Sequence, residues 1–326
     1  MAVRLSRHGG NPILAPAGGQ PWEAVSVMNP SVLRAGGTWR MLYRALGGPE
    51  IAIRPGKVYH RSVIGYAQSR DGVRFERRPK PLIEPEHDWE SLGCEDPRAT
   101  MVDGLCYIFY TAVSPGPEGH LRVVVAGAVT EDFVRVRKLG PVNLAGAGRF
   151  KAAALFPERI GGRYGFLFTE DADRPGSTIR YASLGRVEEM FEGEPTRGEP
   201  LLIPSGGAFR GPELGAVPLR TDAGWLLVYC PESVRREWAI GAALLSTDDP
   251  RDVIAITRDP LLRPEEGYEK SGYVQDVAFP EGAVVVGDTL RVYYGGADSG
   301  VCLATCDLPP LLASLRRSAR PGRPQV

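Results

Sequence analysis

The sequence lacks an excess of charge of either sign. Lysine plus arginine and aspartate plus glutamate each number 39, so the formal net charge is zero. Proteins that bind nucleic acids or anionic membrane surfaces usually carry a basic surplus. The balance gives no reason to expect either partner, and it leaves small ligands, neutral or locally charged, as the expected class.

Long apolar runs are also missing. No stretch approaches the roughly 20 apolar residues that a membrane-spanning helix needs. The N-terminus, Met1 to Gly10, contains basic residues but has no apolar segment behind it. We therefore expect neither a membrane segment nor a secretory signal peptide.

Cysteine and histidine are scarce, with 5 and 4 residues. The cysteine number is odd, and only Cys302 and Cys306 lie close together in the chain. No second cysteine pair and no histidine pair has the spacing of metal ligands. We expect reduced thiols in a cytoplasmic protein, and no metal.

Glycine and proline are abundant, with 40 and 29 residues, which suits many short strands and turns. One pattern recurs along the chain: a polar strand start, a glycine-containing turn and an aromatic-rich strand. The turns are typical of β-hairpins. In most copies a third strand follows. The repeats start at Asn29, Asp96, Lys151, Glu213 and Asp276.

A fourth strand carries proline at both ends, as edge strands do. It occurs at 81–85, 200–204 and 260–264, but the fifth repeat lacks it. Its equivalent lies at the other end of the chain, at 12–16, so we expect the N-terminal strand to complete the last sheet. The predicted fold is all-β, a five-bladed β-propeller of four-stranded blades over residues 1–306. A short helix and a flexible tail are expected over 307–326. The alternative is two β-sandwich domains with a boundary near Gly140 to Gly148.

The first strands of propeller blades line a central channel, so the repeat starts are expected to converge on one funnel. Polar residues are also expected there after the second strands, including Arg44, Glu170 and Asp298. Carboxylates that interrupt apolar strands cost free energy unless they are paired or used. Each residue also has a structural interpretation as a turn residue or an ion pair. Glu158, Glu232 and Glu281 fit salt bridges at the rim. Trp22, Trp89 and Tyr268, each followed by Glu in a recurring aromatic-Glu motif, fit blade packing better than sugar platforms.

With these residues in hand, the sequence resembles glycoside hydrolase family 130, the β-mannoside phosphorylases and β-1,2-mannosidases. The resemblance extends from Asn29 to Ala304. The stretches that carry it include Asn29-Pro30-Ser31, Tyr43-Arg44, Glu95-Asp96-Pro97-Arg98, Lys151 with Leu155-Phe156-Pro157-Glu158, and Phe279-Pro280 with Gly282. Members of the family are five-bladed propellers.

The resemblance implies roles for several of these polar residues. Asp96 would be the general acid of an inverting reaction, with a raised pKa, and Arg98 would order it. The terminal mannosyl unit of a small β-mannoside would be held by Asn29, Arg44, Lys151 and Asp276. No organic cofactor is implied, and a homo-oligomer is left open.

The nucleophile is where the chain departs from the phosphorylases of the family. Those enzymes hold phosphate with basic side chains, whereas this chain has acidic residues after the second strand of the third blade. We therefore predict an inverting β-1,2-mannosidase in which Glu170 and Glu213 activate water. The first alternative is a β-mannoside phosphorylase with inorganic phosphate as co-substrate, held by cations near Lys151. The second is a sugar-binding propeller without catalysis.

Overall fold

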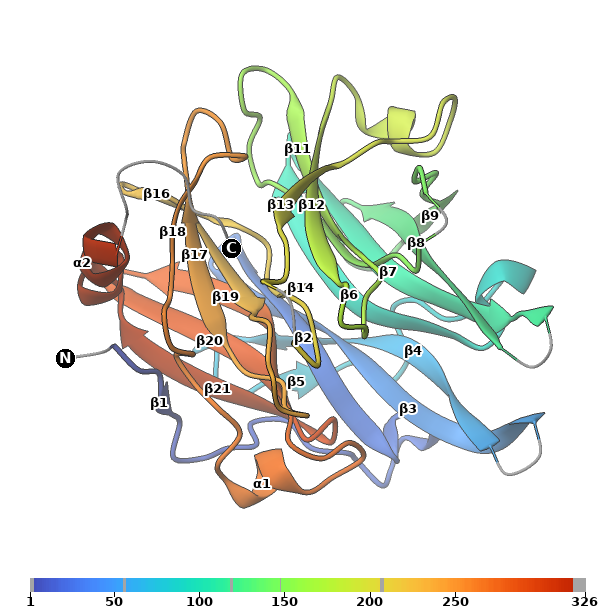
Figure 1. Cartoon of the computed structure of the whole chain (residues 1–326). Coiled ribbons are helices and arrows are strands. Elements are labelled where there is room, and N and C mark those ends of the chain that lie inside the picture. The colour runs from blue at the N-terminus through green and yellow to red at the C-terminus, as the bar shows by residue number, and fades with distance from the viewer. Residues whose placement is uncertain (1–2, 55–56, 118–119, 147, 206–207, 319–326) are drawn as a thin grey trace.

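The strands of the chain gather into antiparallel sheets (Figure 1). A computed structural model describes residues 3–54, 57–117, 120–146, 148–205 and 208–318. Within these residues the strands form one sheet of eight strands, one of five and two of four. The predicted all-β class is confirmed.

The largest sheet consists of two antiparallel groups joined by a single parallel pairing, between Ser62 and Gly93. The strands of the first group are β2 (Ser26–Ala35), β3 (Thr38–Arg54), β4 (Lys57–Ser69) and β5 (Glu76–Arg77). Those of the second group are β6 (Gly93–Val102), β7 (Leu105–Pro115), β8 (Leu121–Thr130) and β9 (Arg137–Pro141).

Each remaining sheet is one further group. The third contains β10 (Lys151–Leu155), β11 (Tyr164–Glu170), β12 (Thr178–Leu184) and β13 (Glu199–Leu202). The fourth contains β14 (Glu213–Leu214), β15 (Leu219–Thr221), β16 (Gly224–Cys230), β17 (Gly241–Leu245) and β18 (Val253–Ile256). The fifth contains β19 (Ala278–Val286), β20 (Thr289–Gly296), β21 (Gly300–Asp307) and β1 (Ser6–Arg7).

The N-terminal segment pairs with the last strand of the chain. Ser6 lies opposite Thr305 and Arg7 opposite Ala304, while Leu14 forms an isolated bridge with Val301. The sequence predicts this partnership, although it places the strand at 12–16 instead of at Ser6–Arg7. The N-terminal segment therefore supplies the edge strand that the fifth repeat lacks.

A buried glutamate fixes the edge strand in three groups of the described chain. Glu23, Glu90 and Glu269 accept hydrogen bonds from the second-strand tyrosines Tyr43, Tyr110 and Tyr294 at 2.7, 2.8 and 2.7 Å. A cation from the edge strand pairs with each one: Arg77, Lys138 and Arg7, respectively. Each cation lies directly opposite an alanine of the neighbouring strand. The aromatic-Glu motif thus connects the edge strand to the second strand, and it is a packing element, as predicted.

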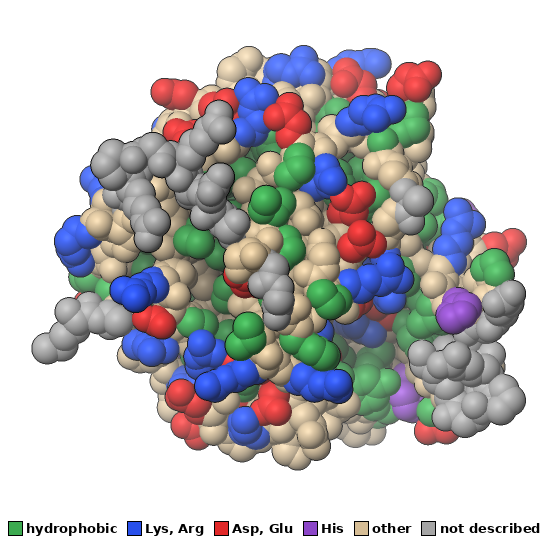
Figure 2. Space-filling model, viewed as in Figure 1, with side chains coloured by type: hydrophobic (Ala, Val, Ile, Leu, Met, Phe, Trp, Pro, Cys, Tyr) green, Lys and Arg blue, Asp and Glu red, His purple; other side chains and the backbone are tan. Residues whose placement is uncertain are grey.

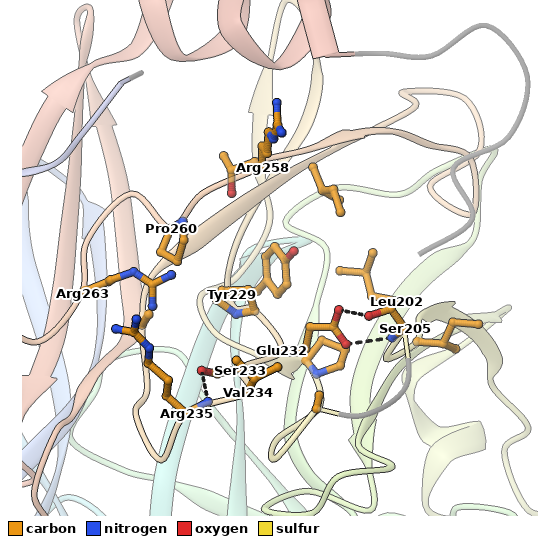
Figure 3. A pocket seen from close by; sticks show the side chains of 17 residues that line it. Leu202, Ser205, Tyr229, Glu232, Ser233, Val234, Arg235, Arg258, Pro260 and Arg263 are labelled. Carbon is orange, nitrogen blue, oxygen red and sulfur yellow. Dashed lines mark hydrogen bonds between the residues drawn. The ribbon is translucent and has the colours of Figure 1, made fainter. Parts of the chain in front are cut away.

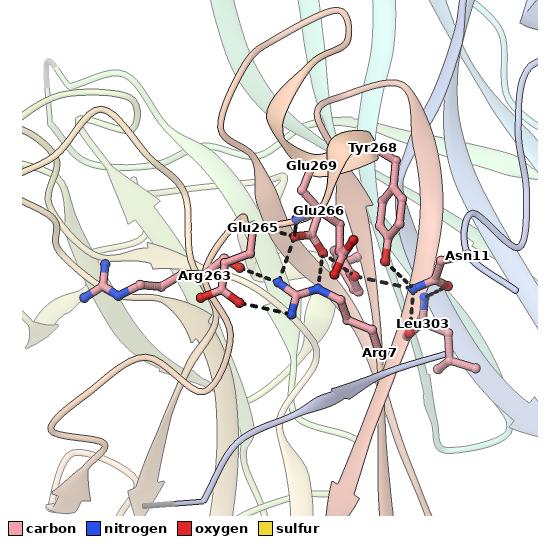
Figure 4. Close-up of polar contacts among 9 residues, drawn as sticks. Arg7, Asn11, Arg263, Glu265, Glu266, Tyr268, Glu269 and Leu303 are labelled. Atoms are coloured by element: carbon pink, nitrogen blue, oxygen red, sulfur yellow. Dashed lines mark hydrogen bonds and ion pairs between the residues drawn. The ribbon is translucent and has the colours of Figure 1, made fainter. Parts of the chain in front are cut away.

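In the fifth group this cation comes from the other end of the chain. Arg7 donates to both carboxylate oxygens of Glu269 at 2.8 Å and to the carbonyl oxygen of Arg263 at 2.6 Å (Figure 4). Glu269 belongs to the short helix α1 (Gly267–Lys270) and is fully buried. The N-terminal strand is thus tied to the rest of the chain by a buried ion pair as well as by backbone hydrogen bonds.

The inner strands are bulged where their polar residues lie. The pairing of β2 with β3 shifts register between Met28 and Ser31, and that of β6 with β7 shifts between Glu95 and Arg98. Asn29 and Asp96 occupy these bulges with φ of 51° each, in the left-handed region that Asn and Asp tolerate better than most residues. In β10 the equivalent bulge residue is Ala152, at φ 49°, so Lys151 lies one position before the place that the repeat alignment gives it.

Aromatic packing is continuous across the segment where the two-sandwich alternative places its boundary. Phe109 of β7 packs on Phe166 of β11 with ring centroids 5.0 Å apart, and both belong to one buried apolar cluster. The inner strands also contact one another: β2 packs on β19 and β6, β10 on β6 and β14, and β19 on β16. This packing brings their polar residues toward one place.

The chain beyond β21 forms helix α2 (Leu308–Ser318), which buries Leu308, Leu311 and Leu315 against the fourth and fifth groups. The flexible end predicted after this helix, 319–326, lies outside the described residues. No helix in the described ranges has the length and apolar character to cross a membrane. Basic and acidic side chains are interspersed over the face shown in Figure 2, in keeping with the balanced composition.

Candidate active site

Polar residues from all five groups line one pocket, which we call the Asp96 pocket. Six of the eight residues predicted for the site lie in its lining: Asn29, Arg44, Asp96, Arg98, Lys151 and Glu213. The lining also includes Asp298, which the sequence analysis expects in the funnel, and residues that the prediction did not assign to the site or assigned elsewhere: Ala152, Asp173, Trp238, Val277, Phe279 and Glu281.

Asp96 is held by its neighbours on both sides. The amide of Asn29 donates to Asp96 Oδ1 at 2.8 Å, and Nη1 of Arg44 lies 3.3 Å from the same oxygen. Burial favours the neutral acid, but Arg44, Lys151 and Arg98 outweigh it and keep the pKa of Asp96 below its ordinary value. The expectation of a raised pKa is therefore wrong for the unliganded pocket, because cations surround this carboxylate.

Arg98 ties Asp96 to the fourth and fifth groups. Its guanidinium donates to the backbone carbonyl oxygens of Asp96, Leu214 and Gly215 at 3.0, 2.8 and 3.0 Å. Nη2 also lies 3.1 Å from Glu281, and both side chains are almost completely buried. The prediction that Glu281 belongs to the rim is wrong, since it lies in the pocket lining, and burial raises its pKa well above the ordinary value.

A second carboxylate orients Arg44. Glu95 accepts hydrogen bonds from Arg44 Nη2 at 2.7 Å and from Ser62 at 3.0 Å, and the hydroxyl of Tyr59 donates to the same oxygen. Tyr59 belongs to β4, which pairs with β3. These contacts fix the guanidinium of Arg44 beside Asp96.

Cations gather around Asp173, which also lines the pocket. Lys151 Nζ and Arg149 Nη2 lie 2.9 and 3.5 Å from Asp173 Oδ2. The guanidinium carbon of Arg210 stacks 3.3 Å from the ring centroid of Trp238, and the charge of Arg210 is felt by both Asp173 and Glu213. We call Arg149, Lys151 and Arg210 the cation cluster.

Two carboxyl groups of the pocket have pKa values near neutrality. Burial, helped by the charge of Asp173, raises the pKa of Glu213 to about 7. Burial also raises the pKa of Asp298 to about 6, against the influence of Arg44. Groups that titrate near pH 7 are suited to proton transfer, and Glu213 accepts only the backbone N–H of Asp173, at 2.9 Å, among the hydrogen bonds of the described chain.

The other two predicted site residues lie outside the pocket lining. Glu170 pairs with Arg180 of the neighbouring strand, and Asp276 pairs with Lys270 of α1. The residue before Glu170 is Thr169, whose backbone pairs with Lys151 and whose hydroxyl accepts a hydrogen bond from the N–H of Leu214. Successive side chains of a strand point to opposite faces, so Glu170 points away from the pocket. The fifth group instead presents Asp298, from the turn between β20 and β21.

A second cavity lies behind the fourth group (Figure 3). Tyr229, Pro212 and Ala239 line it, and the chain neighbours of the last two, Glu213 and Trp238, line the Asp96 pocket. Glu232 is engaged there by the backbone N–H of Ser205 at 2.7 Å and by the Ser205 hydroxyl. Glu232 is therefore a structural residue of this cavity, apart from the Asp96 pocket.

Asp173 is the pocket residue that sequence reasoning missed. It lies two residues after the acidic pair Glu170-Asp171 in a turn, and the repeat gives no signal for it. Within the described ranges, no group of three or more His, Cys, Asp and Glu side chains could hold a metal ion. The pocket thus offers carboxyl groups, an amide and cations to a ligand.

An all-β chain with buried carboxyl groups and cations in one pocket has the make-up of a carbohydrate-active protein, because sugar hydroxyls are held by such groups. The family described as beta-1,4-mannooligosaccharide phosphorylase, glycoside hydrolase family 130, matches residues 14–317. The chain belongs to this family.

Relatives of known activity align with nearly the whole chain. A 1,2-beta-oligomannan phosphorylase of Thermoanaerobacter sp. (strain X514) is 33% identical over 94% of this chain and 98% of its own. A beta-1,2-mannobiose phosphorylase of the same organism is 31% identical over 93% and 97%. The structure of a beta-1,2-mannobiose phosphorylase from Listeria innocua, in complex with beta-1,2-mannobiose, superposes with a TM-score of 0.81 at 25% identity, covering 96% of this chain and 99% of its own.

Proposed function

We propose that the protein is a phosphorylase that cleaves β-1,2-linked mannosides with inorganic phosphate. The observation that carries the proposal is that a carboxylic acid, Asp96, shares one pocket with Lys151 and Asp173, where the cation cluster gathers. Relatives with 33% and 31% identity along the chain are phosphorylases of such mannosides. Phosphorolysis replaces hydrolysis as the favoured reaction because Arg210, which the sequence analysis did not assign, is a third positive charge that acts on Asp173 besides Arg149 and Lys151.

In the proposed reaction, a phosphate oxygen attacks the anomeric carbon of the terminal mannosyl unit. The bond from this carbon to the glycosidic oxygen breaks, and the proton of Asp96 passes to the departing oxygen. The products are mannose 1-phosphate with inverted configuration and an oligosaccharide shortened by one unit. Asp96 then regains a proton from solvent before the next turnover.

Phosphate binding supplies the condition under which Asp96 can act as an acid. Lys151 is among the groups that lower the pKa of Asp96 in the unliganded pocket. A phosphate on Lys151 cancels part of this positive potential, so the pKa of Asp96 rises when phosphate arrives. The acid is then protonated mainly in the complex in which its proton is needed.

The mannosyl unit is held on the Asp96 side of the pocket. Asn29, Arg44 and Asp298 present an amide, a guanidinium and a carboxyl group there, and Glu95 fixes the orientation of Arg44. Arg98 orders Asp96 through its backbone carbonyl oxygen at 3.0 Å. Glu170 and Asp276 take no part in this proposal, since their carboxylates pair with Arg180 and Lys270.

Hydrolysis is the second candidate, and Glu213 is the observation in its favour. A buried carboxyl group with a pKa of about 7 in the pocket can take a proton from an attacking water. In this reaction water replaces phosphate as the nucleophile, Glu213 receives its proton, and free mannose is released while Asp96 protonates the glycosidic oxygen.

Product analysis with purified protein separates the two reactions. β-1,2-Mannobiose and β-1,4-mannobiose are incubated with and without inorganic phosphate, and mannose and mannose 1-phosphate are quantified. We expect mannose 1-phosphate from the β-1,2-linked substrate, and only with phosphate. Free mannose released at equal rates in both buffers would mean that the enzyme is a hydrolase.

We also propose that the five groups are the blades of a propeller spanning residues 1–306, closed by the pairing of β1 with β21. The contacts between successive inner strands and the Arg7–Glu269 ion pair support this arrangement. A cytoplasmic location fits the proposed use of phosphate and the buried thiols Cys94, Cys106, Cys230 and Cys302, which all have raised pKa values.

A further inference from the structure

We propose that Asp173 selects the nucleophile by occupying the phosphate position of the cation cluster until phosphate displaces its carboxylate. The inference rests on the proposed function, since it concerns the same pocket. It assigns a specificity-determining role to a residue outside the predicted site. The argument depends on where the carboxylate lies, on how its loop is held and on what remains when it leaves.

The carboxylate of Asp173 lies where an incoming anion would bind. One oxygen, Oδ2, is 2.9 Å from Lys151 Nζ and 3.5 Å from Arg149 Nη2. Burial opposes ionisation, but Lys151 and Arg149 outweigh it and keep the pKa of Asp173 below its ordinary value. Asp173 therefore remains charged at neutral pH and neutralises much of the cluster.

The backbone around Asp173 is fixed, so its side chain is the part that can move. Its N–H donates to Glu213 at 2.9 Å, the preceding Ala172 is completely buried, and the carbonyl oxygen of Arg174 accepts from Ser177 and Gly211. In contrast, the side chain of Asp173 is 36% exposed. Rotation about its first side-chain bond can turn the carboxylate toward solvent without loop movement.

Displacement of Asp173 changes which nucleophile the pocket accepts. With the carboxylate in place, a phosphate dianion meets an anion at the cluster and is repelled, while water is unaffected. With the carboxylate turned away, Lys151 and Arg149 are left without this partner and attract phosphate. The strength of the Asp173 contact therefore sets the phosphate concentration at which phosphorolysis replaces hydrolysis.

The test is isothermal titration of inorganic phosphate into the full chain without mannoside. Asp173→Asn keeps the shape of the side chain, and asparagine tolerates the left-handed φ of 67°. We expect this variant to bind phosphate about tenfold more tightly than the wild type, because the competing charge is gone.

Matched variants make the result specific to the contact. Asp171→Asn, in the same turn, removes a carboxylate that pairs with the exposed Arg174 at 3.5 Å and should leave phosphate binding unchanged. Lys151→Gln in the Asp173→Asn background should abolish the gain. Asp173→Gly, which suits the left-handed backbone, serves as a second variant if Asp173→Asn folds poorly.

Unchanged or weaker phosphate binding in both Asp173 variants overturns the proposal, because the carboxylate would then support the cations and not compete for them. The titration measures occupancy without turnover. It is therefore distinguishable from a failure of the proposed function, which would appear as a lack of mannose 1-phosphate in the product analysis.

Discussion

The side chain of Asn29 donates a hydrogen bond to that of Asp96 at 2.8 Å, although 67 residues separate them in the chain. Both residues occupy bulges with φ of 51° in the inner strands of neighbouring groups. The repeat thus brings an amide and an acid together at equivalent positions. The first prediction follows from this pair.

Asp96→Asn should abolish most of the activity while leaving the fold intact. Asparagine accepts the left-handed backbone of this position but has no proton to give to the leaving oxygen. Removal of a general acid typically costs on the order of 10²- to 10⁴-fold in rate. We expect kcat/KM for β-1,2-mannobiose to fall within this range and Tm to change by only a few degrees. Activity above a tenth of the wild-type value would show that another group protonates the glycosidic oxygen.

Glu213→Gln and Glu170→Gln should differ in their effect on free mannose. Glu213 lines the pocket and can accept a proton from water, whereas Glu170 pairs with Arg180 outside the lining. In buffer without phosphate, we expect Glu213→Gln to remove any residual release of mannose and Glu170→Gln to leave it unchanged. The measurement is mannose formation over time at saturating mannobiose. Loss of mannose release in Glu170→Gln alone would restore the predicted role of Glu170.

The raised pKa of Glu213 predicts a dependence of stability on pH. Its folded-state pKa of about 7 lies above the ordinary value of 4.5, so its contribution is fully present below about pH 4.5 and is lost as pH rises through 7. Relative to Glu213→Gln, the wild type should lose on the order of 2 to 3 kcal/mol between pH 4.5 and 7.5.

Urea unfolding of both proteins across this pH range measures the difference. Asp298, whose pKa is about 6, contributes with the same sign but is present in both proteins and cancels. A difference in unfolding free energy that stays constant with pH would mean that folding does not raise the pKa of Glu213.

Arg7→Met should destabilise the whole protein, although Arg7 lies near the N-terminus. The substitution leaves the carboxylate of Glu269 buried without its cation, and breaking a buried ion pair typically costs about 3 to 5 kcal/mol. Glu269 keeps hydrogen bonds from Tyr294 and two backbone N–H groups, so we expect about 2 to 3 kcal/mol in urea unfolding.

Arg4→Ala is the matched control for this prediction. Arg4 belongs to the same segment but makes an exposed hydrogen bond to Pro260, so its removal should change stability by less than about 0.5 kcal/mol. Equal effects of the two substitutions would mean that the Arg7–Glu269 contact does not hold the N-terminal strand.

Most of the strand pattern could be read from the sequence because local residue chemistry sets it. Gly36 and Gly37 have φ of 58° and 77°, which only glycine adopts readily, and they join β2 to β3 as the hairpin pattern predicts. The aromatic-Glu motif was likewise assigned to packing from its recurrence alone. Asn29, Arg44, Asp96, Arg98, Lys151 and Glu213 reached the same pocket as predicted.

The side chains beyond a bulge could not be placed in the same way. A strand alternates its side chains with a period of two, and each bulge adds a residue that resets this alternation. The shifts between Lys151 and Ala154 and between Pro280 and Gly282 are therefore invisible to a count along the chain. Glu281 lies within the second of these shifts, so a count along the chain assigns it to the rim.

The sequence by itself determined the repeats and the β class, because these depend on residues that are neighbours in the chain. Only the tertiary structure decided that Asp173 lies between Lys151 and Arg149. It likewise decided that Asp276, unlike the equally expected Asp298, lies outside the pocket lining. Charge pairing acts over a few ångströms between residues far apart in sequence, and the packing of the strands alone sets those distances.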